Sequence, residues 1–324
     1  MRSWRTFSIP KGLFWLSLTA MTLLAALLSL SLGSVALGDA PEAAKRILVY
    51  IRLPRTCAAL LAGASLAVAG AVIQTVLHNP LASPGILGVN SGAGLAVAVV
   101  CALVPAAQRY TPIIAFFGAL AAVLIVMTLA QCTGASRMTV VLAGVAISNI
   151  FSAGIDAVVS FVPEALGGVS DYRIGGFSGV TMARIFPAAV MIGVSMIVVF
   201  TMARQMDVLA LGSETARSLG LSVGPVRFVL LVLAAALSGA AVSFAGLLGF
   251  VGLIVPHAMR RFVGEESGPL MAASALGGAG FVTLCDLLAR VLFAPFELPV
   301  GVVLAFAGGP FFLWLLFRQR GGRA

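Results

Sequence analysis

Few residues in this 324-residue chain have the types and spacing that catalysis or metal binding needs. Ser178 lies in the sequence Gly-Phe-Ser-Gly, and His257 is one of only two histidines, so one reading is a nucleophilic serine with a histidine base. Four residues match such a pattern easily by chance, and these four fall in a polar loop. The histidines His78 and His257 are isolated and no H-E-x-x-H motif is present, so we expect no metal site and no catalytic residues.

The chain also lacks a phosphate-binding loop for ATP. Its two lysines are Lys11 and Lys45, and neither belongs to a G-x-x-x-x-G-K-[ST] motif. If ATP drives a reaction here, ATP and Mg²⁺ must bind to another chain, and we expect no cofactor on this one. The four cysteines are widely spaced without a C-x-x-C pair, which is typical of small helix-packing residues.

The composition indicates a membrane protein. Hydrophobic residues make up 60% of the chain and charged residues 10%, whereas a soluble domain carries roughly a quarter charged residues. The net charge of +9 could suggest nucleic-acid binding, but the arginines are scattered over loops, so we expect no nucleic acid as partner. We predict an all-α polytopic membrane protein in which residues 1–324 form a single transmembrane domain.

Ten apolar runs are candidates for membrane spans, each of which needs about 20 mostly apolar residues. The run 250–262 is short and contains Pro256, so it is expected to be a bent or partial span. The first run exceeds the roughly 7–15 apolar residues of a signal peptide, and we interpret it as an uncleaved span. The runs are 13–33, 57–77, 91–108, 112–132, 139–161, 185–203, 227–248, 250–262, 269–292 and 300–318.

Ten spans place both termini on one side of the membrane. If that side is the cytoplasm, inner segments hold twelve of the twenty lysines and arginines and outer segments hold eight, in agreement with the positive-inside rule. The first outer loop is nevertheless basic and includes Arg52 and Arg55. An acidic external partner would explain these cations.

The segment 204–224 is a polar island between two apolar runs, and it predicts a short helix. Ser213 can cap its start, Glu214 and Arg217 suit its two dipole ends, and Gly220 can adopt the left-handed conformation after it. The segment is either a solvated loop or a docking element for a partner protein. Its apolar side would consist of Leu209, Leu211, Ala216 and Leu219.

Small and polar residues recur at helical spacing within several runs. Gly63, Ala67, Gly70 and Gln74 form such a face, which predicts close helix packing. Polar residues on a membrane helix face protein or water rather than lipid, so the polar face of 139–161 serves either helix–helix hydrogen bonding or pathway lining. Asp286 and Arg290 are four residues apart and can pair. The polar face comprises Ser148, Asn149, Ser152 and Asp156.

Several long motifs together resemble the FecCD-type permeases, the membrane subunits of bacterial ABC importers for iron–siderophores, haem and cobalamin. The resemblance covers essentially the whole chain. Its motifs, in order, are Arg-Leu-Pro-Arg at 52–55, His-Asn-Pro-Leu-Ala-Ser-Pro-Gly-Ile-Leu-Gly at 78–88, Leu211-Gly212, Ala-Arg-Ser-Leu-Gly at 216–220, Gly-Phe-Val-Gly-Leu-Ile-Val-Pro-His-Ala-Met-Arg-Arg at 249–261, Glu-Leu-Pro-Val-Gly at 297–301 and Gly-Pro-Phe-Phe at 309–312.

The resemblance implies the type II ABC-importer permease fold in the bacterial inner membrane, with about ten spans and both termini in the cytoplasm. It further implies a homodimer around a central pathway, two copies of an ABC ATPase subunit on the cytoplasmic side, and a periplasmic substrate-binding protein on the other.

The resemblance also assigns roles to residues. Arg52, Arg55 and Arg290 match arginines that receive glutamates of the binding protein. The cytoplasmic gate would include Thr133, Gly134 and Ser136, and the pathway Ser148, Asn149 and Ser152. The element that couples to the ATPase would comprise Leu209, Leu211, Gly212, Ser213, Glu214, Ala216, Arg217, Leu219 and Gly220.

The predicted function is ATP-driven import of a metal chelate, with an iron–siderophore or haem ahead of cobalamin because iron chelates are the commoner cargo of the family. The alternative from another class is an ion-coupled secondary transporter. That mechanism needs ionisable groups near mid-membrane, whereas Asp156 and Asp286 lie toward the ends of their runs.

Overall fold

A computed structural model describes residues 10–33, 41–132 and 137–320. These residues form helices and loops without strands. The α-helices are α1 (Lys11–Ser31), α2 (Pro41–Ile47), α3 (Leu53–Leu77), α4 (Val89–Leu103), α5 (Thr111–Cys132), α6 (Arg137–Phe161), α7 (Leu166–Ile174), α8 (Met182–Thr201), α9 (Ala203–Ala210), α10 (Ser213–Ser218), α11 (Val223–Ala245), α12 (Val251–Val263), α13 (Ser267–Val291) and α14 (Val300–Arg320).

Each of the ten predicted runs coincides with a helix. Within the described residues, seven helices are long and apolar enough to cross a membrane: α1, the continuous helix 44–77 that contains α3, α5, α6, α8, α11 and α13. The apolar parts of α4 and α14 are shorter. The run 91–108 was predicted too long, since α4 ends at Leu103 and a 3₁₀ helix follows from Pro105 to Tyr110.

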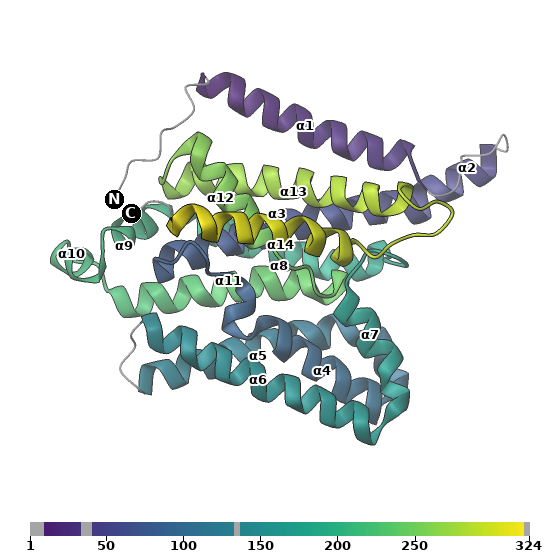
Figure 1. Cartoon of the computed structure of the whole chain (residues 1–324), viewed down its shortest axis with the longest axis horizontal. Coiled ribbons are helices and arrows are strands. Elements are labelled where there is room, and N and C mark those ends of the chain that lie inside the picture. Colours follow the sequence, from purple (N-terminus) through teal and green to yellow (C-terminus); the bar gives the residue numbers. More distant parts are fainter. Residues whose placement is uncertain (1–9, 34–40, 133–136, 321–324) are drawn as a thin grey trace.

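Three helices form the centre of the bundle. About three quarters of the apolar segments of α3, α11 and α13 are buried, against less than a third for α1, α6 and α8. In Figure 1, α1 lies along the outside of α13, and α6 lies at the opposite side of the bundle. The outer helices therefore turn apolar side chains such as Leu16 and Leu142 outward, as lipid contact or association requires.

Glycines let α3 and α13 approach backbone to backbone. A Cβ atom on Gly63 would lie 2.1 Å from the carbonyl oxygen of Gly278, and one on Gly278 would lie 2.3 Å from that of Gly63. Gly70 meets Gly252 of α12 in the same way. The predicted small-residue face of α3 is thus confirmed as a packing face.

The predicted partial span is a 13-residue helix, α12, that contains Pro256. Non-helical chain from Gly246 to Phe250 joins it to α11, and Phe250 adopts the left-handed conformation with φ 65°. Irregular backbone at membrane depth is tolerated where it is buried in protein. Here Leu247 N–H donates to the carbonyl of Tyr172 at 2.9 Å, and Phe250 packs against Gly308, which has no side chain.

The two ends of the bundle differ. α9 and α10 lie at one end, where α1 begins and α14 ends, whereas α2 and α7 lie at the opposite end (Figure 1). We call the first the α10 end, and the second the Arg55 end after the arginine in the first turn of α3. α3 begins at the Arg55 end and finishes at the α10 end, and α13 runs antiparallel to it.

Candidate functional site

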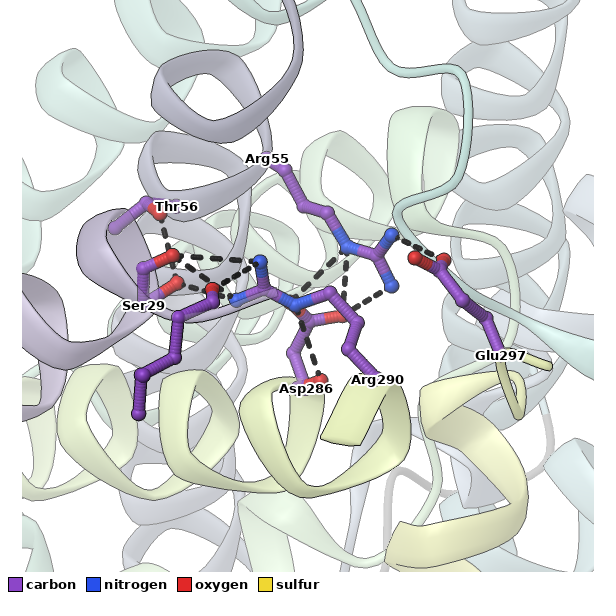
Figure 2. Close-up of polar contacts among 7 residues, drawn as sticks. Ser29, Arg55, Thr56, Asp286, Arg290 and Glu297 are labelled. Carbon is purple, nitrogen blue, oxygen red and sulfur yellow. Dashed lines mark hydrogen bonds and ion pairs between the residues drawn. The ribbon is translucent and has the colours of Figure 1, made fainter. Parts of the chain in front are cut away.

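An ion pair between α3 and α13 organises the Arg55 end. Nε of Arg55 lies 3.1 Å from each carboxylate oxygen of Asp286, and its Nη2 lies 3.0 Å from Oδ1. Asp286 is fully buried. Nη1 of the same guanidinium donates to Glu297, in the loop before α14, at 2.6 Å (Figure 2). One arginine therefore joins three parts of the chain, and the buried carboxylate is matched by a bidentate partner.

Arg290 and Arg52 fix the end of α1 to this cluster. The predicted pair of Arg290 with Asp286 is confirmed at 3.2 Å. Nη2 of Arg290 also donates to the Ser29 hydroxyl at 2.7 Å, as Figure 2 shows, and Nη1 of Arg52 donates to the Ser31 carbonyl at 2.6 Å. Both cations lie at the C-terminal end of α1, where carbonyl groups have no partner within the helix and the helix dipole favours positive charge.

The three arginines predicted to dock a partner line one cavity. This cavity of about 500 Å³ is bounded by Arg52, Arg55, Arg290 and Glu297 together with residues 177–181. Three positive charges against Asp286 and Glu297 leave a formal charge of +1 there. The three arginine side chains are buried and hydrogen-bonded within the chain. Their acidic and carbonyl partners come from α1, α13 and the loop before α14, and the spacing of residues in the sequence does not predict these partners.

A second cavity of about 610 Å³ adjoins the first and shares Arg55, Phe177, Ser178 and Glu297 with it. Tyr172 of α7 contributes to its wall and donates its hydroxyl to the carbonyl of Asn90 at 3.3 Å. Burial raises the pKa of Tyr172, so the hydroxyl stays protonated and remains a donor. Both cavities belong to the Arg55 end.

The predicted coupling segment contains two helices, α9 and α10, rather than one. α10 carries Glu214 in its first turn and Arg217 in its last, and Gly220 has φ +83°, as predicted. The predicted cap by Ser213 is wrong, since Gly212 precedes the helix and the Ser213 hydroxyl accepts a hydrogen bond from Nη2 of Arg227 at 3.0 Å. Arg227 of α11 thereby attaches α10 to the bundle.

The apolar residues of this segment divide into two sets. Leu209 and Ala216 are buried and hold the two helices against the bundle, while Leu211 and Leu219 are each 62% exposed. Glu214, Arg217 and Gly220 are exposed and Gly212 is half-buried. Figure 1 shows α10 projecting beyond the other helices. The exposed leucines on this projection form a small surface that another protein could cover.

Sequence reasoning missed two polar contacts that hold α9. The backbone N–H of Ser267, the first residue of α13, donates to Oδ1 of Asp207 at 2.8 Å. Nε2 of His78, the residue that ends α3, lies 3.1 Å from the carbonyl oxygen of Ala210. The signal available for Asp207 was its position in the polar island, but its partner lies 60 residues away.

The predicted pathway and gate residues are only partly described. Thr133, Gly134 and Ser136 lie outside the described residues. On α6, Asn149 lies on the exposed face, whereas Ser148 and Ser152 are half-buried. Asp156 is on the exposed face too, and its carboxylate lies 3.4 Å from Nη2 of Arg173. This exposed face of α6 is mixed, since it also carries Leu142 and Ile150, each 62% exposed, and polar residues on such a face favour protein or water over lipid.

The residues of the serine–histidine reading lie apart. Ser178 belongs to the loop between the two cavities at the Arg55 end. His257 is one helical turn from Arg260, whose guanidinium contacts Gln74 near the other end of α3, and its ring lies edge-on to Phe311. The fold thus does not assemble a nucleophile and its base from these two residues.

Comparison with known proteins relates the chain to transport permeases. The model of the FecCD transport family matches residues 13–318. The chain is 37% identical over 304 residues to the hemin transport system permease protein HmuU of Yersinia pestis, covering 92% of this chain and 91% of that protein. It is 38% identical over 275 residues to the Fe(3+) dicitrate transport system permease protein FecD of Escherichia coli, covering 85% and 86%.

The fold has a solved counterpart. A structure of an inward-facing ABC transporter, assigned to the metal-chelate type, superimposes with a TM-score of 0.81 at 25% sequence identity and covers 94% of this chain and 98% of that one. The predicted fold, an all-α permease of the type II ABC-importer class, is confirmed by this match together with the helices described above.

Proposed function

The chain belongs to the FecCD transport family, a family of multi-pass inner-membrane permeases, and from this premise we propose that it is the permease subunit of an ATP-driven importer for a ferric chelate or haem. The relatives named for hemin and Fe(3+) dicitrate support this cargo class. They do not favour cobalamin. Such a permease works with an ATPase and a binding protein, and ATP and Mg²⁺ would bind to the ATPase.

The observation that carries the proposal is the exposed surface of α10. Leu211 and Leu219, which flank α10 (Ser213–Ser218) on its two sides, are each 62% exposed at the end of the bundle where α1 begins (Figure 1). Apolar side chains on either side of a short projecting helix suit insertion into a cleft of a partner protein. We assign this surface to contact with the ATPase, which places the α10 end and both termini in the cytoplasm.

The Arg55 end would then face the periplasm and receive the binding protein. Arg52, Arg55 and Arg290 line one cavity with a formal charge of +1, which suits acidic groups of a partner. Because the guanidinium of Arg55 is already paired with Asp286 and Glu297, docking would require an incoming carboxylate to share or replace one of these partners.

Two copies of the chain would enclose the pathway, with α6 as one of its walls. The exposed face of α6 carries Asn149 and Asp156, which suit water or a second subunit better than lipid. Closure of paired ATPases would move the α10 helices and rock the two subunits against each other, so the work enters as a rigid-body change.

The test is ATPase activity of the permease co-purified with its partner ATPase subunit, in lipid. The complex is measured with its binding protein loaded with ferric citrate, a ferric siderophore, haem or cobalamin. We expect an iron chelate or haem to stimulate hydrolysis. Failure to recover any ATPase with the permease would refute the proposal, and stimulation by cobalamin alone would refute the cargo.

A further inference from the structure

The helices α3 and α13 form one unit that links the two ends of the bundle. They are the most extensively contacting helix pair, and they touch backbone to backbone at Gly63 and Gly278. At the Arg55 end the pair is fixed by Arg55 and Asp286. The 25 residues of α13 span about 37 Å at about 1.5 Å per residue, so this unit reaches from the arginine cluster to the α10 end.

At the α10 end, α9 contacts both members of this unit. Met206 and Leu209 of α9 are buried, and Asp207 accepts the N–H of Ser267 at 2.8 Å. Ser267 opens α13 and is itself buried, and no side chain within α13 caps that N–H. A carboxylate at a helix N-terminus satisfies a free donor and meets the positive end of the dipole.

The opposite end of α9 reaches α3. The ring of His78, which follows α3 in the left-handed conformation, bonds to the carbonyl oxygen of Ala210 at 3.1 Å. α9 therefore lies between the residue that follows α3 and the first residue of α13, and α10 follows it after two residues. Figure 1 shows α9 at this end of the bundle, between α10 and the long helices.

We propose that Asp207 is a positioning residue of the transport cycle: its bond to the α13 N-terminus, with His78 as second attachment, carries movement of α10 into the α3–α13 unit and on to the arginine cluster. This inference rests on the proposed function. A rigid path is required because both ends act in one cycle, and a hydrogen bond to a carboxylate is stronger than one between neutral groups.

The test measures how strongly the loaded binding protein stimulates the ATPase activity of the reconstituted complex. Asp207→Ala should lower the ratio of stimulated to basal activity about tenfold, the size expected when one charge-assisted hydrogen bond is lost. Asp207→Asn keeps an acceptor oxygen and should restore most of the ratio. Glu266→Ala is the matched control, since Glu266 is an exposed acid next to Ser267, and it should leave the ratio unchanged.

A second variant removes the donor instead of the acceptor. Ser267→Pro deletes the N–H at the first position of α13, where proline is tolerated, and Glu266 before it has the extended backbone (ψ 125°) that a following proline requires. In Asp207→Ala/Ser267→Pro, the ring occupies space vacated by the carboxylate. If the hydrogen bond itself transmits the movement, the ratio of stimulated to basal activity in the double variant should be no lower than in either single variant.

The outcomes are distinguishable. If the unaltered complex shows no stimulation, the proposed function fails. If the unaltered complex is stimulated and both Asp207→Ala and Ser267→Pro keep the full ratio, the role of Asp207 is refuted while the proposed function stands. An additive loss in the double variant would also overturn it, because the two residues would then act separately.

Discussion

Arg55 and Asp286 face each other across α3 and α13, 231 positions apart in the sequence, with three donor–acceptor distances of 3.0–3.1 Å. The pair stands where α1, α3, α13 and the loop before α14 converge. Its carboxylate has no exposed surface, so the bond is internal to the subunit in the conformation described here. This gives the outer arginines a structural role in addition to the docking role proposed for them.

Breaking this pair from one side should destabilise the permease strongly. Asp286→Ala leaves Arg55 with Glu297 alone and Arg290 without its acidic partner, and loss of one partner of a buried pair costs about 3–5 kcal/mol. The measurement is the thermal unfolding midpoint of the permease in detergent. Arg55→Met/Asp286→Leu should recover part of the loss, because it removes the buried guanidinium that has lost Asp286, while Arg290 still lacks Asp286 and Glu297 lacks Arg55. Equal instability of the double variant would contradict the explanation.

Glu297 should compete with an acidic docking partner. Its side chain is 32% exposed and lies 2.6 Å from Nη1 of Arg55. Glu297→Gln therefore weakens the internal ion pair of that guanidinium and leaves it freer to bind a carboxylate of the partner. Affinity for the binding protein should rise by up to about fivefold, since a partly exposed ion pair is worth up to about 1 kcal/mol. Surface plasmon resonance measures it, with Glu164→Gln, an exposed acid at the same end, as control. Unchanged affinity would show that Glu297 does not compete.

The contact between Gly63 and Gly278 should not tolerate a methyl group. Gly63→Ala places a Cβ 2.1 Å from a backbone oxygen, so α3 and α13 must separate. Overpacking costs about 1–3 kcal/mol in general, and here the obstacle is backbone that cannot rotate away. Gly193→Ala on α8 is the matched control, because no atom lies within 4 Å of its Cβ position. Equal unfolding midpoints for the two variants would contradict the close approach.

The exposed leucines that flank α10, Leu211 and Leu219, should serve association rather than folding. Leu211→Asp/Leu219→Asp should reduce recovery of the ATPase with the permease while leaving the unfolding midpoint nearly unchanged, because surface substitutions usually alter stability by less than about 0.5 kcal/mol. Leu166→Asp, an exposed leucine at the Arg55 end, is the control and should retain the ATPase. Normal recovery with the altered α10 would remove its assigned role.

The sequence predicts the helices well because their signal is local. Each apolar run became a helix, and the Gly63, Ala67 and Gly70 spacing correctly indicated close packing. The run 250–262, with Pro256, predicts a bent or partial span, and the helix found there, α12, is 13 residues long. The run 91–108 extends α4 too far because it follows apolar composition past Pro105, although a proline there signals a helix end near Leu103.

The candidate site was predicted less completely because its contacts are distant in sequence. The motif points to Arg52 and Arg55, but it cannot show that Asp286 and Glu297 already pair with Arg55. Serine is a common N-cap residue, which predicted a cap at Ser213, but the Ser213 hydroxyl accepts a hydrogen bond from Arg227 instead. Asp207 lay within the polar island, but only the fold shows that it meets the start of α13.

The most direct test of the central claim is uptake of radiolabelled iron, supplied as a chelate on the binding protein, into liposomes that contain the permease and its ATPase. We expect uptake that requires ATP inside the liposomes, requires the loaded binding protein outside, and is unchanged by imposed proton or sodium gradients. Uptake driven by an ion gradient without ATP would contradict this claim and would establish secondary transport instead.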